Sequence, residues 1–332
     1  MSNTENFTEE QKEVKRVITR KRVEIAEEIA TVDNLGEETI AILPEDMSIM
    51  YAGKLCATLM KGQVAAKNQL AGYFRMYPHL VEETKLQMTK LQEDFESDFK
   101  ISKERTEKIA ASHPLVQKMI GIKGISGYQL ALIMSYMKNP ARFDTPSKLM
   151  IYAGIGEVNG MAVTKANIAK ISEYYMKTYG REFKGFNTEF SGRMLGVVVD
   201  CLMRGKGFFY NNYVQMRKRL EINAINDRRT FVCTIEEAKE SKGKMKAGVH
   251  YMKGRKNQSL IMWGDQNAKR RIARTFLHLL LTEWRTIAEL PVRIPYPCEY
   301  LGHKRLITLD EVLLADSVKR VNKKKEKNNI ED

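Results

Sequence analysis

The stretch MIGIKGISGYQLALIMSYMKNPARFDTPSKLMIYAGI, residues 119–155, decides the fold because it places a glycine-rich turn directly before an apolar helix. Gly121, Gly124 and Gly127 are spaced three residues apart in this turn. Glycine permits tight turns that residues with a Cβ resist. The stretch therefore predicts two helices joined by a compact glycine turn.

The boundaries of the two helices follow from the residues around the turn. A short helix from Pro114 to Ile120 is expected to end at Gly121. The second helix is expected to begin near Ser126, whose hydroxyl suits an N-cap. Its apolar face is predicted to consist of Leu130, Ile133, Met134 and Met137.

Such a turn can bind a phosphate, because consecutive backbone N–H groups lie at the positive end of a helix. This is the logic of a helix-hairpin-helix motif. The candidate nucleic-acid-binding residues of the turn are Gly121, Lys123, Gly124, Ser126 and Gly127. The alternative is an ordinary helical hairpin whose glycines serve only as caps, and the turn alone does not decide between the two.

The distribution of charge favours a nucleic-acid partner. The chain has 55 Lys and Arg against 41 Asp and Glu, a net charge of +14. Residues 1–112 carry 16 basic and 20 acidic side chains, whereas residues 201–275 carry 18 basic and 6 acidic ones. Because the excess is concentrated after the hairpin, we expect this part to contact duplex or junction DNA, or a structured RNA.

Two basic clusters are the best candidates for this contact. Arg217, Lys218 and Arg219 follow the aromatic run FFYNNY, and the arginines are better candidates than the rings, which suit a helix core. The second cluster lies in a helix expected from Ala268 to Glu289, with cations crowding its first turns, where they oppose the helix dipole. A bound phosphate would remove this penalty. The cluster comprises Lys269, Arg270, Arg271 and Arg274.

Residues 1–112 are predicted to be a helical N-terminal region. A charged helix is expected over residues 8–31, and the segment TIAIL (39–43) is the one plausible strand. Residues 63–111 show a helical pattern with a break at Pro78. A coiled-coil-like seam is formed by Met88, Leu91, Phe95 and Phe99, so a homodimer through residues 80–111 is one expectation.

The rest of the chain is also predicted to be mainly helical. Thr145 and Pro146 indicate the start of a helix that runs to about Tyr152. A short helix is expected near residues 170–179, and a buried one over 187–203. Residues 221–268 contain many lysines and no convincing core, so they are expected to be a mobile basic insertion.

The predicted fold class is therefore mainly α. A helical N-terminal region with a coiled-coil-like segment (1–112) is followed by a helix-hairpin-helix-containing domain (113–220). The basic insertion (221–268) interrupts this domain, a C-terminal helix and extension complete it (269–316), and a basic tail (317–332) is expected to be disordered.

The cysteines and histidines speak against a resident metal. Cys56, Cys201, Cys233 and Cys298 are far apart and show no CxxC pair, which fits a reducing cytoplasm. No apolar run reaches membrane length, and the first 30 residues are charged. A cytoplasmic, nucleoid-associated protein without a membrane partner or cofactor is expected.

An ordered set of short matches resembles one known family. The set contains Gly124-Ile125, the helix from Leu130 to Met134, Arg142-Phe143, Pro146 with Lys148-Leu149, and Tyr152-Ala153-Gly154. Weaker matches continue through residues 205–220 and 267–285 to PVRIPY and EYLGH. Over residues 114–305 the chain resembles the C-terminal helix-hairpin-helix domain of the insertion-sequence 110/116/902 transposases.

This resemblance implies a role in DNA transposition or recombination. Such transposases combine a ribonuclease-H-like domain that binds metal through four carboxylates with a domain that carries a nucleophilic serine, and they work with a guide RNA. Here the early carboxylates, such as Glu45 and Asp46, lie in loop-like sequence and are expected at the surface, so we expect the metal domain to be missing. Mg²⁺ would enter only if a partner supplied that domain.

The family serine has no counterpart at residues 157–165, and the nearest hydroxyls are Thr164, Ser172 and Ser191. A hydroxyl without an adjacent base is ordinarily structural, so these are weak catalytic candidates. Two hypotheses remain: a transposase-family protein that acts in recombination without a complete catalytic site of its own, and a noncatalytic architectural or regulatory nucleic-acid-binding protein descended from one.

Overall fold

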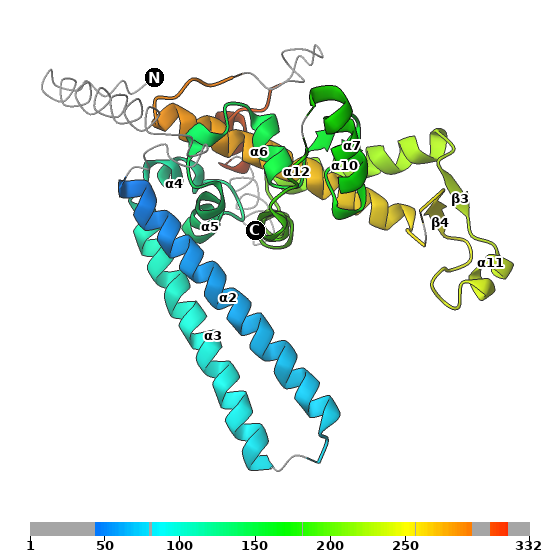
Figure 1. The fold of residues 1–332 in the computed structure, drawn as a ribbon, viewed down its shortest axis with the longest axis horizontal. Helices are drawn as coiled ribbons and strands as arrows, with labels where there is room; N and C mark the ends of the chain where they lie inside the picture. Colours follow the sequence, from blue (N-terminus) through cyan, green and yellow to red (C-terminus); the bar gives the residue numbers. More distant parts are fainter. Residues whose placement is uncertain (1–43, 80–81, 181, 256, 294–305, 318–332) are drawn as a thin grey trace, which may run out of the picture.

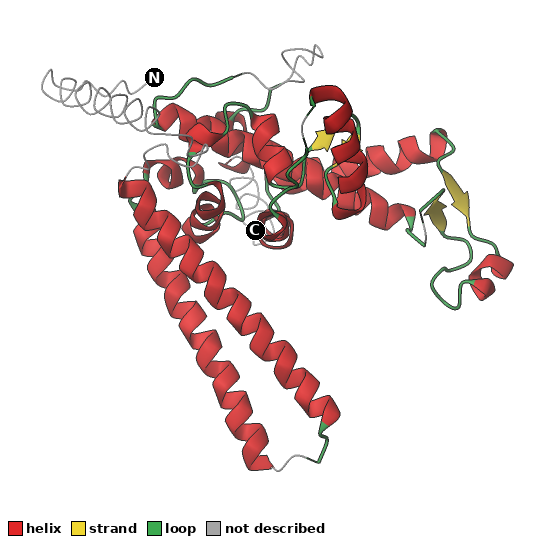
Figure 2. Cartoon of the chain, viewed as in Figure 1, coloured by secondary structure: helices red, strands yellow, loops and turns green. Residues whose placement is uncertain are grey.

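The computed structural model describes residues 44–79, 82–180, 182–255, 257–293 and 306–317. The expected helix over residues 8–31, the expected strand over 39–43 and the tail beyond 317 lie outside these ranges. The described chain is mainly helical, as predicted, and its strands form two short antiparallel pairs (Figure 2). A helical body carries two projections at opposite ends (Figure 1).

The first projection is a long helical hairpin of α2 (Pro44–Met76) and α3 (Glu82–Ala111). The predicted break at Pro78 is confirmed, because the helices are joined there. However, α2 begins at Pro44, well before the expected position near residue 63. Its base crosses α5 closely, and a Cβ on Gly53 would lie only 2.2 Å from the carbonyl oxygen of Ala131.

The expectation that Asp46 lies in a surface loop is wrong. Asp46 lies in the first turns of α2, is 5% exposed, and accepts a 2.7 Å hydrogen bond from Nε2 of His113. Nδ1 of the same ring accepts from the N–H of Leu115 at 3.2 Å, so the proton resides on Nε2. This buried pair fastens the start of α2 to the junction between α3 and α4.

The predicted seam of α3 is buried only where the hairpin meets the body. Phe99 is partly buried and packs edge-on against Tyr128, with ring centroids 6.2 Å apart. Leu91 and Phe95, farther along the hairpin, remain 62% and 41% exposed. The two helices alone cannot cover an apolar seam of this width.

The glycine hairpin forms as predicted. It consists of α4 (Pro114–Met119) and α5 (Gly127–Met137), and Ser126 is the N-cap of α5. Nearly every side chain of α5 is buried, so this helix lies at the centre of the body. The η1 turn (Pro140–Arg142) and α6 (Pro146–Tyr152) follow, and the hydroxyl of Thr145 accepts from the N–H of Lys148, as expected for its cap.

A small module then folds around its own apolar cluster. The hairpin of β1 (Glu157–Val158) and β2 (Met161–Ala162) leads through η2 (Lys165–Asn167) into α7 (Ile168–Tyr179). The cluster contains the buried side chains Val158, Val163, Ile171 and Phe183. The helix expected near 170–179 is therefore confirmed, whereas the β-hairpin was not predicted.

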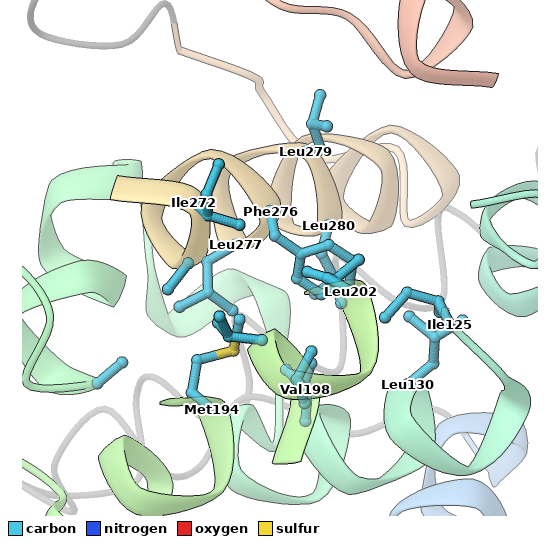
Figure 3. Close-up of a cluster of buried hydrophobic side chains, with 14 of the residues drawn as sticks. Ile125, Leu130, Met194, Val198, Leu202, Ile272, Phe276, Leu277, Leu279 and Leu280 are labelled. Atoms are coloured by element: carbon cyan, nitrogen blue, oxygen red, sulfur yellow. The ribbon is translucent and has the colours of Figure 1, made fainter. Parts of the chain in front are cut away.

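The main core forms where α12 packs across the preceding helices (Figure 3). The buried helix expected over 187–203 is present as α8 (Thr188–Arg193), a π-helical turn (η3, Met194–Val198) and α9 (Val199–Gly205). Phe276 and Leu277 of α12 (Leu260–Ile287) point toward these helices, while Leu279 lies on the other side of α12. All three side chains are at most 2% exposed.

The second projection is an arm at the ends of α10 and α12. Helix α10 (Phe208–Asn226) runs alongside α12 and leads into β3 (Thr230–Val232), α11 (Ile235–Glu240) and β4 (His250–Met252). Strands β3 and β4 pair antiparallel, with Phe231 opposite Tyr251. Residues 221–268 thus have defined elements, and Tyr251, Met252 and Trp263 are buried. The expectation of a coreless insertion is wrong, because α10 and α12 both extend into this region.

A C-terminal helix over residues 309–317 returns to the body. Leu309, Val312 and Asp316 are its buried residues. Among the described residues, no helix combines the length and the apolar composition that a membrane span requires.

Candidate nucleic-acid interface

The glycines of the hairpin turn serve close packing. Gly124 has a φ of +90°, and a Cβ there would lie 2.1 Å from the carbonyl oxygen of Cys201 in α9. A Cβ on Gly127 would lie 2.9 Å from that of Ala110, and one on Gly121 would lie 2.7 Å from Cδ2 of Leu313. Neighbouring helices therefore cover the turn on several sides.

The backbone donors of the turn are largely used within the protein. The N–H of Lys123 donates to Oδ2 of Asp316 at 2.9 Å. The N–H of Ile125 donates to the carbonyl of Ile122 at 3.1 Å, and the N–H of Ser126 donates to Oε1 of Gln129 at 2.9 Å. The N–H groups from Gly124 to Gly127 were predicted to bind a phosphate, and two of them, those of Ile125 and Ser126, already donate within the protein.

Two carboxylates already occupy the electropositive side of the turn. Asp316 is 2% exposed and accepts a second bond, at 2.7 Å, from the N–H of Phe208, the first residue of α10. Glu107 of α3 accepts from the hydroxyl of Ser126 at the start of α5. Both charges suit helix N-termini and would repel a phosphate. The turn thus matches the alternative in which its glycines cap and pack helices.

The first basic cluster, in α10, divides into one paired and two unpaired cations. Nε of Arg217 donates to Oε1 of Glu221 at 2.7 Å. This hydrogen bond is the largest cause that raises the pKa of the guanidinium, and a hydrogen bond with Tyr213 is the second. Lys218 and Arg219 are exposed. Neither has an ion pair or side-chain hydrogen bond within the described ranges. Arg217 therefore stabilises α10, whereas Lys218 and Arg219 are free to bind an anion.

In the second cluster, three of the four cations have internal partners. Lys269 lies 3.4 Å from Asp265 and 3.7 Å from Asp200. Nη1 of Arg270 donates to the carbonyl of Gly154 at 3.0 Å. Arg274 donates from Nε to the carbonyl of Ile155 and from Nη2 to Glu157, both at 2.7 Å.

The dipole argument for this second cluster is wrong. Helix α12 begins at Leu260, where Ser259 accepts from the N–H of Met262, so Lys269 lies more than two turns inside the helix. The field of the helix end is negligible there. Arg270 and Arg274 instead fasten α12 to the chain that leaves α6.

Arg271 is the exception, and it lies in a cluster of arginines with few counter-charges. The residue is exposed, and no hydrogen bond or ion pair links its side chain to the described parts of the chain. Desolvation by the surrounding protein lowers the pKa of its guanidinium, and the nearby charges of Arg274 and Arg219 lower it further. Glu157 is the carboxylate that opposes this effect.

The exposed cations of α10 and α12 form a positively charged surface. Arg219 of α10 and Arg271 of α12 face solvent, and Arg270 and Arg274 supply further positive charge beneath them. Because arginine stays charged at all physiological pH values, the field is permanent. We call Arg219, Arg270, Arg271 and Arg274 the arginine face.

The three candidate hydroxyls are not assembled into a catalytic site. Thr164 precedes η2, Ser172 lies in α7 and Ser191 in α8. Within the described ranges, none of them is hydrogen-bonded to a histidine or a carboxylate. The same part of the chain has no group of three or more His, Cys, Asp or Glu side chains placed to hold a metal ion.

Sequence reasoning missed the internal counter-charges Asp316, Glu107 and Glu157. A carboxylate at 316 is separated from its donor at 123 by 193 residues, so no local pattern could indicate the contact.

Comparison of the chain with protein-family models, curated proteins and solved structures finds no match.

Proposed function

We propose that this protein binds nucleic acid through the arginine face of α10 and α12. The observation that carries the proposal is that Arg219 and Arg271 are exposed and that neither side chain has an ion pair or a hydrogen bond within the described chain. A polyanion would neutralise these charges and release its own counterions. Duplex or junction DNA is the expected ligand, and a structured RNA carries the same phosphodiester charges.

We further propose a role in DNA transposition or recombination, within the insertion-sequence 110/116/902 transposase family. The support for this role is the ordered run of motifs from Gly124 to Gly154. In this proposal the chain contributes nucleic-acid binding, and a partner contributes the metal-binding carboxylates with their Mg²⁺.

A noncatalytic architectural or regulatory role is the second candidate. It is favoured by Thr164, Ser172 and Ser191, which have no hydrogen-bonded base among the described residues. The two candidates differ in chemistry: incubation with junction DNA and Mg²⁺ should leave a covalent protein–DNA adduct if a serine or threonine acts. Absence of an adduct, or an adduct unchanged by replacing all three hydroxyls, would remove that form of the enzyme hypothesis.

Binding itself is tested with the double variant R219Q/R271Q. We expect the wild-type protein to bind a duplex of about three helical turns with a steep negative dependence of log K on log salt. Losing two phosphate contacts should reduce this slope by about 1.8. The melting temperature should stay unchanged, because neither side chain has an internal partner.

The matched control is K90Q/K100Q, which removes the same charge from exposed positions of α3. If the protein binds through its net charge alone, both double variants should lose affinity equally. That result, or a wild-type slope near zero, would contradict the proposal.

A further inference from the structure

The arm carries a second set of unpaired cations, in the loop that joins α11 to β4. Lys242, Lys244 and Lys246 alternate along this loop, and all three are exposed. The loop lies at the far end of the α10–α12 pair, away from the body (Figure 1). We call residues 241–249 the lysine loop.

Hydrogen bonds fix the backbone of the lysine loop. The N–H of Met245 donates to the hydroxyl of Ser241 at 3.0 Å, and the N–H of Lys246 donates to the phenol oxygen of Tyr251 at 3.0 Å. Gly248 donates to the carbonyl of Cys233, also at 3.0 Å. The lysines therefore extend from a preorganised backbone, which lowers the entropy lost on binding.

The arm that holds the loop is itself anchored to the body. Tyr251 is 5% exposed, and its ring centroid lies 6.2 Å from that of Phe231 across the strand pair. The guanidinium of Arg229 lies over the ring of Trp263 in α12, 5.5 Å from its centroid. The loop is thus presented at a defined place relative to α12, and not on a free chain.

The charges of the loop are not neutralised by the arm. Asp227 pairs with Arg229 at 2.9 Å, and Glu237 accepts from the N–H of Thr234 at 2.8 Å to cap α11. No carboxylate lies within ion-pair distance of Lys242, Lys244 or Lys246 among the described residues. Three ammonium groups in five residues repel one another, and a row of phosphates would compensate them.

We infer that the lysine loop is a second contact surface for the phosphate backbone of the nucleic acid that the arginine face binds. This inference rests on the proposed function. Both surfaces lie on the α10–α12 pair, the arginine face partway along it and the lysine loop beyond its end. The inference requires a duplex long enough to span from the arginine face to the lysine loop, so a short duplex should contact only one of them at a time.

The test compares two duplex lengths with the variant K242Q/K244Q/K246Q. With a duplex of about three helical turns, we expect affinity to fall at least tenfold at about 0.1 M salt, and the salt slope to fall by two to three. With a duplex of about one turn, affinity should change less than about twofold, because the arginine face remains. The control K90Q/K100Q/K108Q removes three exposed lysines of α3 and should leave both affinities close to wild type.

Each other outcome is informative. If the loop variant binds the long duplex like wild type while R219Q/R271Q does not, the inference fails and the proposed function stands. If neither variant changes binding, the proposed function fails as well. If the loop variant loses self-association, measured by sedimentation, and keeps its DNA affinity, the loop binds protein and the inference is overturned. Circular dichroism melts identify any variant that has not folded.

Discussion

The hairpin turn and the arginine face were both predicted to bind phosphate. They differ in whether their polar groups already have partners inside the protein. The N–H groups of Lys123, Ile125 and Ser126 in the turn donate to Asp316, a local carbonyl and Gln129, whereas the Arg219 and Arg271 side chains have no partner in the described chain. A motif can therefore have the right shape while several of its donors are already used within the protein. Charge without an internal partner is the more direct sign of a binding surface.

The largest effect should come from Gly124→Ala in the turn. The φ of Gly124 is positive, and the added Cβ would lie only 2.1 Å from the carbonyl oxygen of Cys201. The substitution should therefore destabilise the fold by more than about 4 kcal/mol. Gly160→Ala is the control, because its φ is also positive but no atom lies within 4 Å of the added Cβ. It should cost only about 1–2 kcal/mol in urea unfolding. Similar values for both variants would show that the turn is not closely packed.

Acid should weaken the fold without weakening the arginine face. Burial lowers the pKa of His278, on the core side of α12, to about 4 from an ordinary 6.5. The unfolded chain then binds more protons between these values, so stability is complete above about pH 6.5 and falls by about 3 kcal/mol as the pH approaches 4. His278→Leu should flatten this part of the unfolding profile. An unchanged profile would contradict the assignment.

Asp316→Asn tests whether the turn depends on its internal carboxylate. Asparagine would place an amide where two N–H groups now donate to the carboxylate, so we expect a loss of about 2–3 kcal/mol. Asp310→Asn removes the same charge from an exposed position of the same helix and should stay within about 0.5 kcal/mol of wild type. Tighter DNA binding by Asp316→Asn, with unchanged stability, would show that the turn does bind phosphate.

The smallest effect separates the two roles of neighbouring arginines. Arg270→Gln removes the bond to the Gly154 carbonyl and should lower stability by about 1–2 kcal/mol. Arg271→Gln should leave the melting temperature unchanged and reduce DNA affinity. Equal melting temperatures for the two variants would contradict the assigned roles.

Local patterns in the sequence predicted much of the fold. Ser126, Thr145 with Pro146, and the glycine spacing were enough to place α5, α6 and the turn, because capping depends on adjacent residues. The start of α12 was missed, since its first two turns contain Gly264, Asp265 and Gln266 and are held by packing against α10. Tertiary contacts override weak helix propensity in such segments.

The candidate site was predicted only in composition. The sequence identified the cations of both clusters, but not which of them form ion pairs or hydrogen bonds within the protein. Lys269 depends on Asp200, and Arg274 on Glu157, 117 residues away. The division between structural and free arginines is therefore a tertiary property.

The most direct test of this account compares the salt dependence of duplex binding for K123Q and R219Q/R271Q. Lys123 is the cation of the turn, and Arg219 and Arg271 are the free cations of the arginine face. The account predicts an unchanged slope for K123Q and a slope reduced by about 1.8 for R219Q/R271Q. A reduced slope for K123Q together with a wild-type slope for R219Q/R271Q would contradict it.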